Sequence, residues 1–192
     1  MYQKRKERLA FDYHEMMKLQ NRPYLSWIVT KGEPPYAEEY LMTIKARTYA
    51  LGATEHAYRV GVIRECTVRM TLWDSYPVIA PNTKMLNIPP VFHPDWYSKG
   101  TYCPSELWHE EDSLKDYVKR MIQTLTYEPT LIEAEHPANF KALAWYQKHR
   151  ENTELFPSDT IELTENSPEK TADMEKAALS FGEVIDSWDI KR

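Results

Sequence analysis

The side chains best suited to covalent chemistry lie in one stretch near the middle of the chain. His93, Pro94 and Asp95 follow one another, and Cys103 comes eight positions after the aspartate. A thiolate is a good nucleophile near neutral pH even when few of the thiols are ionised, and the thioester that it forms stays reactive toward amines. A buried hydrophobic thiol is the competing interpretation of a lone cysteine. The polar, proline-rich setting of Cys103 after Gly100 favours the nucleophile.

This stretch is predicted to be a long loop, because hydrophobic periodicity is lost from residue 88 to residue 108. A long connection without regular structure inside a compact domain is usually functional or disordered. Its many aromatic side chains argue against disorder: Phe92, Trp96, Tyr97, Tyr102 and Trp108. Cys66 is interpreted differently, because it lies in a segment that alternates apolar and polar residues and is therefore assigned to the core.

The elements on either side of the loop must position it. A helix is predicted at the start of the chain, where one side carries Leu9, Tyr13, Met16 and Gln20. Period-two alternation or β-branched and aromatic content predicts strands at 24–30, 40–46, 66–73 and 83–87. After the loop, one helix begins at Ser113 and a second runs from about Pro137 through His149. The predicted fold class is α+β, with an N-terminal helix, a four-stranded antiparallel meander, the loop and two C-terminal helices.

Charge divides the chain into two unequal parts. Residues 151–192 hold 11 Asp and Glu against 4 Lys and Arg, a net of −7, so that of the −5 total the first 150 residues carry +2. We predict a domain over 1–150 and, over 151–192, an acidic linker followed by an amphipathic helix. Ser167, Pro168 and Glu169 are typical of a helix start, and an apolar stripe follows from Met174 to Ile185. This helix either packs on its own domain or is offered to a further partner.

Several classes of function are excluded by composition. The 5 glycines are spread too widely for a glycine-rich phosphate loop, the 6 histidines form no zinc-protease motif, and the 2 cysteines are not spaced as metal ligands. We therefore expect no cofactor and no metal. No apolar run reaches the roughly 18 residues of a membrane span, and no signal peptide is visible, so a cytoplasmic protein without a membrane contact is expected. The acidic balance argues against nucleic acid as a partner.

Together, three motifs resemble the ubiquitin-conjugating enzymes over about residues 5–149. Tyr76-Pro77 with Pro81 matches the Tyr-Pro-x-x-x-Pro turn of that family. Pro90-Val91-Phe92-His93-Pro94-Asp95 stands where the family has Phe-His-Pro-Asn. Gly100-Thr101-Tyr102-Cys103 then matches its Gly-x-x-Cys. Trp108 corresponds to the tryptophan that follows, but it comes only five residues after Cys103, so the loop after the cysteine is shorter than in the family.

The resemblance implies a thioester carrier. Cys103 accepts the C-terminus of a ubiquitin-like modifier from an activating enzyme and passes it to an amine of a target protein. His93 and Pro94 shape the active-site loop, and Tyr102 and Trp108 are structural parts of it. The resemblance also gives the basic residues of the first helix a role in docking the activating enzyme, although a solvated face is the alternative: Lys4, Arg5 and Arg8.

The chain departs from the family at Asp95, where the family's asparagine donates to the oxyanion as the amine attacks. An ionised Asp95 has no proton to donate, so three roles stay open: a base for the incoming lysine, a clamp of the loop, or a protonated acid in a desolvated site. The acid that positions the substrate lysine in many members has three candidates here, Glu128, Glu133 and Glu135, with a solvated surface as the alternative. Residues 108–111 replace the turn that members offer to ring-type ligases.

This divergence favours a bacterial conjugation system encoded beside its own activating enzyme and modifier, with a role in antiviral defence. Two other functions compete with the carrier. One is a non-catalytic binding module of the same fold that recognises ubiquitin-like proteins; Cys103 counts against it and Asp95 counts for it. The other is a cysteine hydrolase that pairs Cys103 with His93 or His109.

Overall fold

The structure, a computed structural model, describes residues 2–53, 58–104, 108–156, 162–166 and 170–174. Its elements follow the chain in the order α1 (Tyr2–Met17), β1 (Leu25–Lys31), β2 (Glu39–Ile44), β3 (Thr48–Ala53), β4 (Tyr58–Ile63), β5 (Cys66–Thr71), β6 (Asn82–Met85), α2 (Leu114–Leu125), the 3₁₀ turn η2 (Pro129–Leu131) and α3 (Phe140–His149). None of the helices within these ranges combines the length and the apolar character that a membrane span requires.

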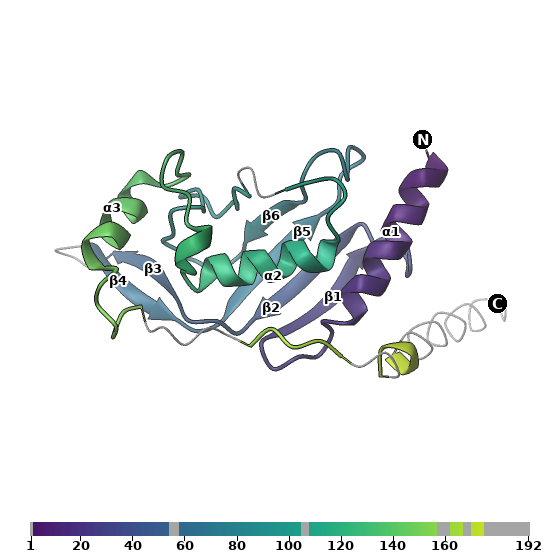
Figure 1. Cartoon of the computed structure of the whole chain (residues 1–192), viewed down its shortest axis with the longest axis horizontal. Helices are drawn as coiled ribbons and strands as arrows, with labels where there is room; N and C mark the ends of the chain where they lie inside the picture. Colours follow the sequence, from purple (N-terminus) through teal and green to yellow (C-terminus); the bar gives the residue numbers. More distant parts are fainter. Residues whose placement is uncertain (1, 54–57, 105–107, 157–161, 167–169, 175–192) are drawn as a thin grey trace, which may run out of the picture.

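The predicted four-stranded meander is confirmed. Strands β1, β2, β5 and β6 pair antiparallel in that spatial order, as Figure 1 shows. Alternate residues of each strand are buried, so Trp27, Met42 and Val68 lie on the face that meets the helices. Cys66 belongs to this buried set and is 0 % exposed, which confirms its assignment to the core.

The predicted meander lacked two strands that the structure contains. Strands β3 and β4 follow β2 and precede β5 in the chain, and they form a separate antiparallel hairpin outside the four-stranded sheet. Figure 1 places this hairpin beside α3, at the end of the molecule opposite α1. The hairpin is tied to the long loop, because the amide of Phe92 donates to the carbonyl oxygen of Tyr49 at 2.7 Å. The hairpin therefore forms one wall of the region around the loop.

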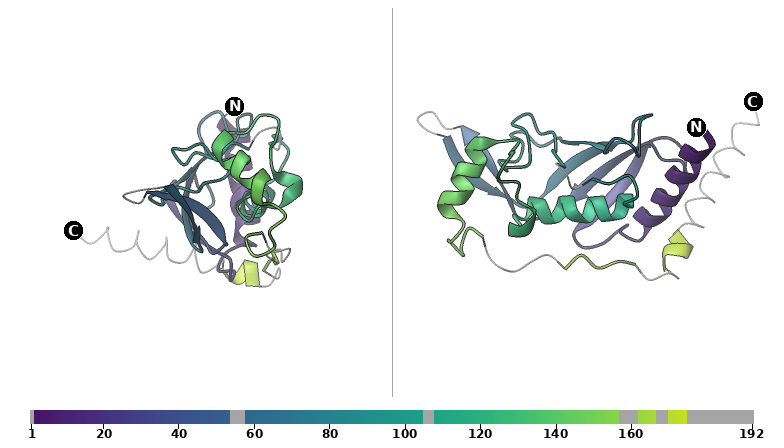
Figure 2. Two further views of the ribbon diagram at one scale, coloured as in Figure 1. Left: turned by 90° about the vertical axis from the view of Figure 1, so that its left-hand side faces the viewer. Right: turned by 45° about the horizontal axis from the view of Figure 1, so that its top comes forward.

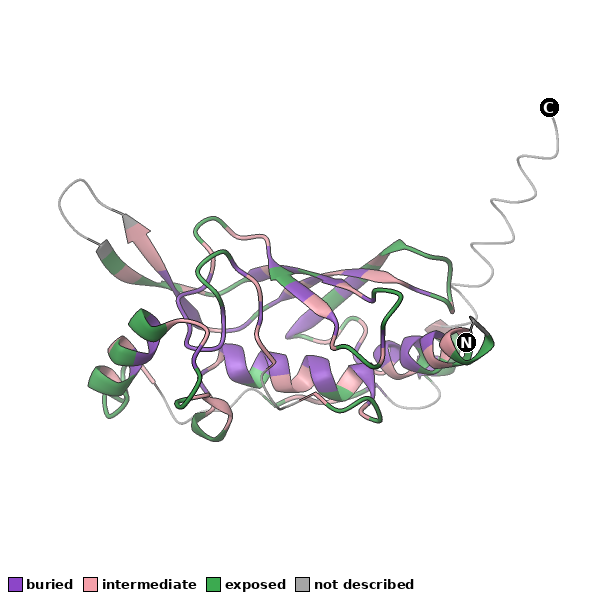
Figure 3. Cartoon of the chain, turned by 90° about the horizontal axis from the view of Figure 1, so that it is seen from above, coloured by how far each residue is buried: buried purple, intermediate pink, exposed green. Residues whose placement is uncertain are grey.

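Helices α1 and α2 cover one face of the sheet (Figure 2). Helix α2 begins where predicted, because the side chain of Ser113 accepts the amide of Asp116 as an N-cap. The buried carboxylate of Asp12, in α1, accepts the amide of Leu114 at 2.9 Å and so joins the two helices. Figure 3 shows the buried faces of α2 and the strands turned toward each other.

Helix α3 begins three residues later than the predicted Pro137. Asn139 is its N-cap, and the side chain oxygen of Asn139 accepts the amide of Ala142 at 3.2 Å. The helix packs on a second, aromatic cluster around Tyr49 and Tyr127 rather than on the main core. This cluster fixes α3 beside the hairpin.

The described part of the predicted linker lies against the domain. Residues 162–166 run along α2 toward the C-terminal end of α1 (Figure 1). The side chain of Asn166 donates to the carbonyl oxygens of Met17 and Gln20, and Glu165 pairs with Lys115 and Lys119. Residues 170–174 are helical, and the rest of the predicted C-terminal helix lies outside the described residues. The division at residue 150 stays a prediction.

Candidate functional site

The loop that carries Cys103 is pinned to the edge of the sheet. Gly100 has a φ of +86°, and a side chain there would place its Cβ 3.1 Å from the carbonyl oxygen of Met85. This close approach lets the amide of Met85 donate to the carbonyl oxygen of Gly100 at 2.7 Å. A glycine is therefore required three residues before Cys103 for two physical reasons, its left-handed backbone and its lack of a side chain.

Cys103 lies half-buried at the end of this loop. Its amide donates to the carbonyl oxygen of Asp95 at 2.8 Å, and the hydroxyl of Tyr97 donates to its sulfur at 3.8 Å. The bond to the sulfur raises the pKa of Tyr97, so the phenol keeps its proton. The backbone of Cys103 is thus held by a hydrogen bond, and its half-buried side chain lies beside a hydrogen-bond donor.

The second cysteine has the opposite environment. Burial raises the pKa of the Cys66 thiol to about 12. A thiol that stays protonated in an apolar interior is a poor nucleophile. Of the two cysteines, Cys103 is therefore the one whose surroundings allow acyl transfer.

His93 is buried, and its hydrogen bond is to another residue of the loop. Its Nδ1 accepts the amide of Asp95 at 3.1 Å, and its ring lies 4.3 Å from the ring of Tyr127, measured between centroids. Burial lowers the pKa of His93 to about 3, so the imidazole is neutral at physiological pH. These contacts fit the architectural role that the resemblance implied for His93.

Asp95 is 3 % exposed and joins three parts of the site. Its carbonyl oxygen accepts the amide of Cys103, and its own amide donates to Nδ1 of His93. Its side-chain Oδ1 accepts the amide of Glu133 at 3.1 Å. The other carboxyl oxygen, Oδ2, is buried without a hydrogen-bond partner among the described residues. Burial raises the pKa of Asp95 to about 7, so protonated and ionised forms coexist near neutral pH. The geometry thus contains the contacts of a clamp together with the conditions for a protonated acid.

The acidic candidates are not equivalent. Glu133 lies next to Asp95 through its amide, and its carboxylate accepts the amides of Glu135 and His136, which fixes the turn before α3. Glu128 instead hydrogen-bonds the hydroxyl of Thr130. Among the three glutamates named from the sequence, the contacts bring Glu133 to the site.

Pro94 and Tyr102 attach the loop to neighbouring elements. The carbonyl oxygen of Pro94 accepts the amide of Asn139, the N-cap of α3, at 2.9 Å. The hydroxyl of Tyr102 lies 3.3 Å from the hydroxyl of Thr124, and its ring packs on Trp96 with centroids 5.0 Å apart. The loop is therefore tied to α3, to α2 and to its own interior.

Trp108 anchors the chain after the cysteine. Its indole nitrogen donates to the carbonyl oxygen of Pro77 at 2.9 Å, and its ring packs edge-on against Tyr117. Residues 105–107, between Cys103 and this anchor, lie outside the described residues. His109, the other histidine proposed as a partner of Cys103, is exposed. Within the described ranges no hydrogen bond joins Cys103 to either histidine.

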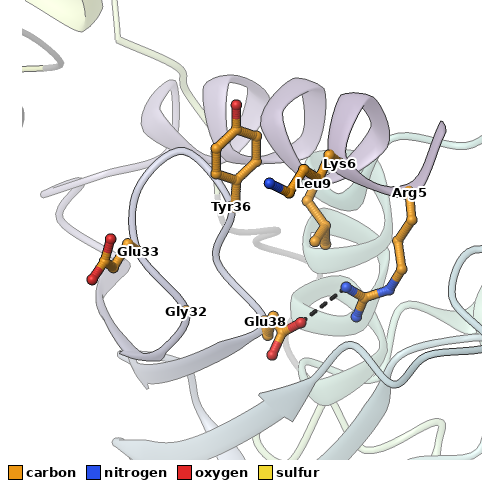
Figure 4. Close-up of a pocket in the computed structure, with 7 residues that line it drawn as sticks. All are labelled: Arg5, Lys6, Leu9, Gly32, Glu33, Tyr36 and Glu38. Carbon is orange, nitrogen blue, oxygen red and sulfur yellow. Dashed lines mark hydrogen bonds and ion pairs between the residues drawn. The ribbon is translucent and has the colours of Figure 1, made fainter. Parts of the chain in front are cut away.

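Two of the three basic residues of α1 predicted to dock a partner contact other residues of the same domain. Arg5 pairs with Glu38 at 2.9 Å, as Figure 4 shows, and also donates to the carbonyl oxygen of Leu72. Arg8 pairs with the buried Asp12, whereas Lys4 is exposed. Arg5 and Arg8 thus stabilise the fold, and their proposed role in docking stays a prediction.

The described residues contain no group of three potential metal-ligating side chains. No family model and no curated protein matches the sequence.

Solved structures do resemble the chain. The ubiquitin conjugating enzyme E2 UbcA1 from Agrocybe aegerita is 15 % identical over 74 % of this chain and 92 % of its own, with a TM-score of 0.46. S. cerevisiae Ubc12 is 16 % identical over 84 % of each chain, with a TM-score of 0.48. Because both TM-scores lie below 0.5, an assignment of function must rest on the site geometry described above.

Proposed function

We propose that the protein carries a ubiquitin-like modifier as a thioester on Cys103. The observation that carries the proposal is the setting of this cysteine: its amide donates to the carbonyl oxygen of Asp95 at 2.8 Å, while the residue is only half-buried. An acyl carrier needs a nucleophile that is fixed in place and still open to two large partners in turn. The competing interpretation of Cys103 as a buried hydrophobic thiol does not account for a residue that is fixed by its backbone and only half-buried.

The reaction has two acyl transfers. In the first, the sulfur of Cys103 attacks the thioester carbonyl of a modifier held on an activating enzyme, a new C–S bond forms, and the thiolate of that enzyme leaves. In the second, the amine of a target protein attacks the carbonyl, a C–N bond forms, and Cys103 leaves as the thiolate. The amine loses its proton to solvent. Neither step changes an oxidation state or needs a cofactor.

Asp95 acts in the second transfer. The tetrahedral intermediate carries an oxyanion, which a hydrogen-bond donor stabilises and a carboxylate repels. Protonated Asp95 carries its proton on Oδ2, the buried oxygen without a hydrogen-bond partner in the described structure, and this proton must reach the oxyanion when the amine attacks. Ionised Asp95 keeps the clamp to Glu133 but has lost the donor. The rate of discharge is therefore tied to the protonation of Asp95.

A charging assay tests the proposal. The protein is mixed with ATP and with the activating enzyme and modifier encoded nearest to it, and the products are separated on gels with and without thiol. A band heavier by one modifier that thiol removes is the expected result. Cys103→Ser should give a slower-forming band that thiol does not remove. Cys66→Ala is the matched control and should charge normally, because Cys66 is buried in the core.

A reducible band that persists in Cys103→Ser would place the nucleophile elsewhere. If the folded wild-type protein forms no band with an activating enzyme that charges itself, the carrier is wrong. The non-catalytic binding module is then the function to test, by measuring whether the uncharged protein binds the modifier.

A further inference from the structure

Residues 162–166 and 170–174 bring the C-terminal segment, residues 175–192, to the end of α1 (Figure 1). The backbone amide of Asn166 donates to the carbonyl oxygen of Lys18 at 2.6 Å. The side-chain nitrogen of Asn166 donates to the carbonyl oxygen of Met17 at 3.1 Å and to the sulfur of Met174 at 3.9 Å, and Met174 also packs on the main core. Met174 is therefore held beside the last turn of α1, which fixes where the C-terminal segment begins.

The sequence of the C-terminal segment, which lies outside the described residues, predicts an amphipathic helix. Its large apolar residues share one side of that helix with Met174: Phe181, Ile185 and Trp188. Residues 177–190 carry three acids and no Lys or Arg: Glu183, Asp186 and Asp189. At about 100° per residue, Asp186 and Asp189 fall toward one edge of the apolar side, and Glu183 falls on the opposite side. The segment therefore offers an apolar stripe with a negative edge.

The N-terminal half of α1 has the complementary character. Residues 2–11 carry four basic side chains and one acid, Glu7, and the basic residue Lys4 is exposed. The first turn holds no acid, although the N-terminal end of a helix favours negative charge. Phe11, farther along the helix, is 51 % exposed. This half of α1 therefore suits an occupant that supplies carboxylates and an apolar side chain.

The spacing of the C-terminal segment matches the spacing of these groups on α1. Two antiparallel helices both advance by about 1.5 Å per residue, so equal numbers of residues keep them level. Counted from Met174 beside the last residue of α1, Phe181 comes level with Phe11 to within one residue. Asp186 and Asp189, farther along, come level with the first turn of α1. The apolar group and the carboxylates thus arrive where α1 lacks them.

We propose that residues 175–192 fold back as a helix antiparallel to α1, with Phe181 against Phe11 and with Asp186 and Asp189 at the basic first turn. The occupant of this surface is a segment of the same chain. Lys4 is also predicted to dock the activating enzyme, so the docked segment competes with that enzyme and slows the loading of Cys103. This consequence rests on the proposed function, whereas the docking itself does not.

Carbodiimide cross-linking of the full wild-type chain tests the docking. The reagent activates a carboxyl group, a neighbouring lysine amine attacks it, and an amide forms while the reagent leaves as a urea. We expect peptides that join Lys4 to Asp186 or Asp189 in the band of the monomer. Lys115 and Glu165, whose charged atoms lie 3.3 Å apart, are the internal positive control.

Two results of this experiment would overturn the proposal. One is the absence of the link to Lys4 in a sample where Lys115 and Glu165 are joined. The other is a link to Lys4 that is found only in the band of a dimer, because the segment of a second copy would then occupy the surface.

Paired variants test the apolar contact. Phe181→Ser should lower the yield of the link to Lys4 about fivefold, because one phenylalanine supplies a large part of the apolar area that docking buries. Leu179→Ser is the control, since it makes the same kind of change at a position that lies off the apolar side of the predicted helix. Equal yields from the two variants would contradict the proposed contact.

Loading of Cys103 gives a second readout. The concentration of activating enzyme that gives half-maximal loading should fall about fivefold in Phe181→Ser, as expected when a surface is covered for about four-fifths of the time. It should stay unchanged in Leu179→Ser, and the maximal rate should be equal in all three proteins. Equal concentrations for the two variants would contradict the competition. Failure of every protein to charge would contradict the proposed function alone, because the cross-link forms without charging.

Discussion

The amide of Cys103 donates to the carbonyl oxygen of Asp95 at 2.8 Å, so one hydrogen bond joins the proposed nucleophile to the buried carboxyl residue of the loop. The side chain of Asp95 then reaches the amide of Glu133 on the turn before α3. Asp95 thus connects the loop that carries Cys103 with the turn at Glu133, which follows it in the chain. A change at Asp95 is expected to act on transfer to the amine more than on the position of Cys103, because the contact with Cys103 is made by the backbone.

Asp95→Asn should leave loading nearly intact and change the pH dependence of discharge to free lysine. Asparagine offers a donor at every pH, whereas the donor of Asp95 is lost as the pH rises through its pKa of about 7. Near pH 6 the two proteins should discharge at similar rates. At pH 8 only about a tenth of Asp95 is protonated, so the variant should be faster by about tenfold.

The measurement is single-turnover discharge onto free lysine between pH 6 and 8.5, expressed as the ratio of variant to wild type. The ionisation of the lysine amine is common to both proteins and cancels in the ratio. A ratio that does not change with pH would contradict the role of Asp95 as the donor to the oxyanion. A variant that becomes slower than wild type as the pH rises would instead assign Asp95 as the base.

The same group should make stability depend on pH. The pKa of Asp95 is about 7 in the folded protein against an ordinary value of 3.8 for an aspartate, so between these values the folded state binds more protons than the unfolded state. Stability from this group is therefore complete at pH 4 and is lost as the pH rises to 7, by on the order of 3 kcal/mol. Asp95→Asn has no such ionisation. The free energy of unfolding of the wild type should therefore fall relative to that of the variant as the pH rises from 5 to 8. Urea unfolding at several pH values measures this, and parallel profiles would show that Asp95 does not titrate as described.

Tyr97→Phe should slow loading of Cys103 by about three- to tenfold, the range expected for one hydrogen bond. The phenol is 48 % exposed, so the fold should not depend on its hydroxyl. Tyr36→Phe is the control, because Tyr36 is also exposed, at 42 %, and lines a pocket beside α1 (Figure 4). Rapid-quench loading with saturating activating enzyme gives the rate. Equal rates for the two variants would mean that the Tyr97 hydroxyl does not assist the sulfur.

Sequence patterns predicted the parts of the fold that one buried face governs. Strands β2 and β5 and helix α2 follow from periodicity, because every second or every third and fourth residue must enter the core. Strand β1 was predicted from its aromatic and β-branched residues, and β6 as a shorter candidate at 83–87. The hairpin was missed because residues 54–57, which join its strands, contain none of the usual hairpin-turn residues Gly, Asn or Asp. Its strands also carry Gly52 and Gly61, which weaken a strand signal.

The candidate site could be predicted only as a set of residue types. Cys103 and His93 could be named from their motif, but the burial of Asp95 depends on the turn at Glu133, which is 38 positions away in the chain. Tyr97 was noted as an aromatic residue of the loop, and its role appears only because the turn at Gly100 brings its hydroxyl to the sulfur. Contacts of this kind arise from tertiary structure, and no local spacing rule contains them.

Asn166→Ala should destabilise the domain by about 2 kcal/mol, although Asn166 lies 16 positions beyond the predicted boundary at residue 150. The side chain donates to the carbonyl oxygens of Met17 and Gln20, at 3.1 and 2.8 Å, and accepts from Arg22. The carbonyl of Met17 belongs to the last turn of α1 and also accepts the amide of Gln20, whereas the carbonyl of Gln20 lies in the turn that follows the helix. Truncation to alanine would remove one donor from each of these carbonyls and the acceptor of Arg22, and the loss of such buried and part-buried bonds costs more than the loss of an exposed bond. Thermal and urea unfolding measure the effect, with Asn152→Ala as a control on an exposed asparagine of the preceding segment. Equal stability of the two variants would mean that residues 162–166 are a detached linker, as the charge pattern predicted, and a selective loss would make them part of the folded domain.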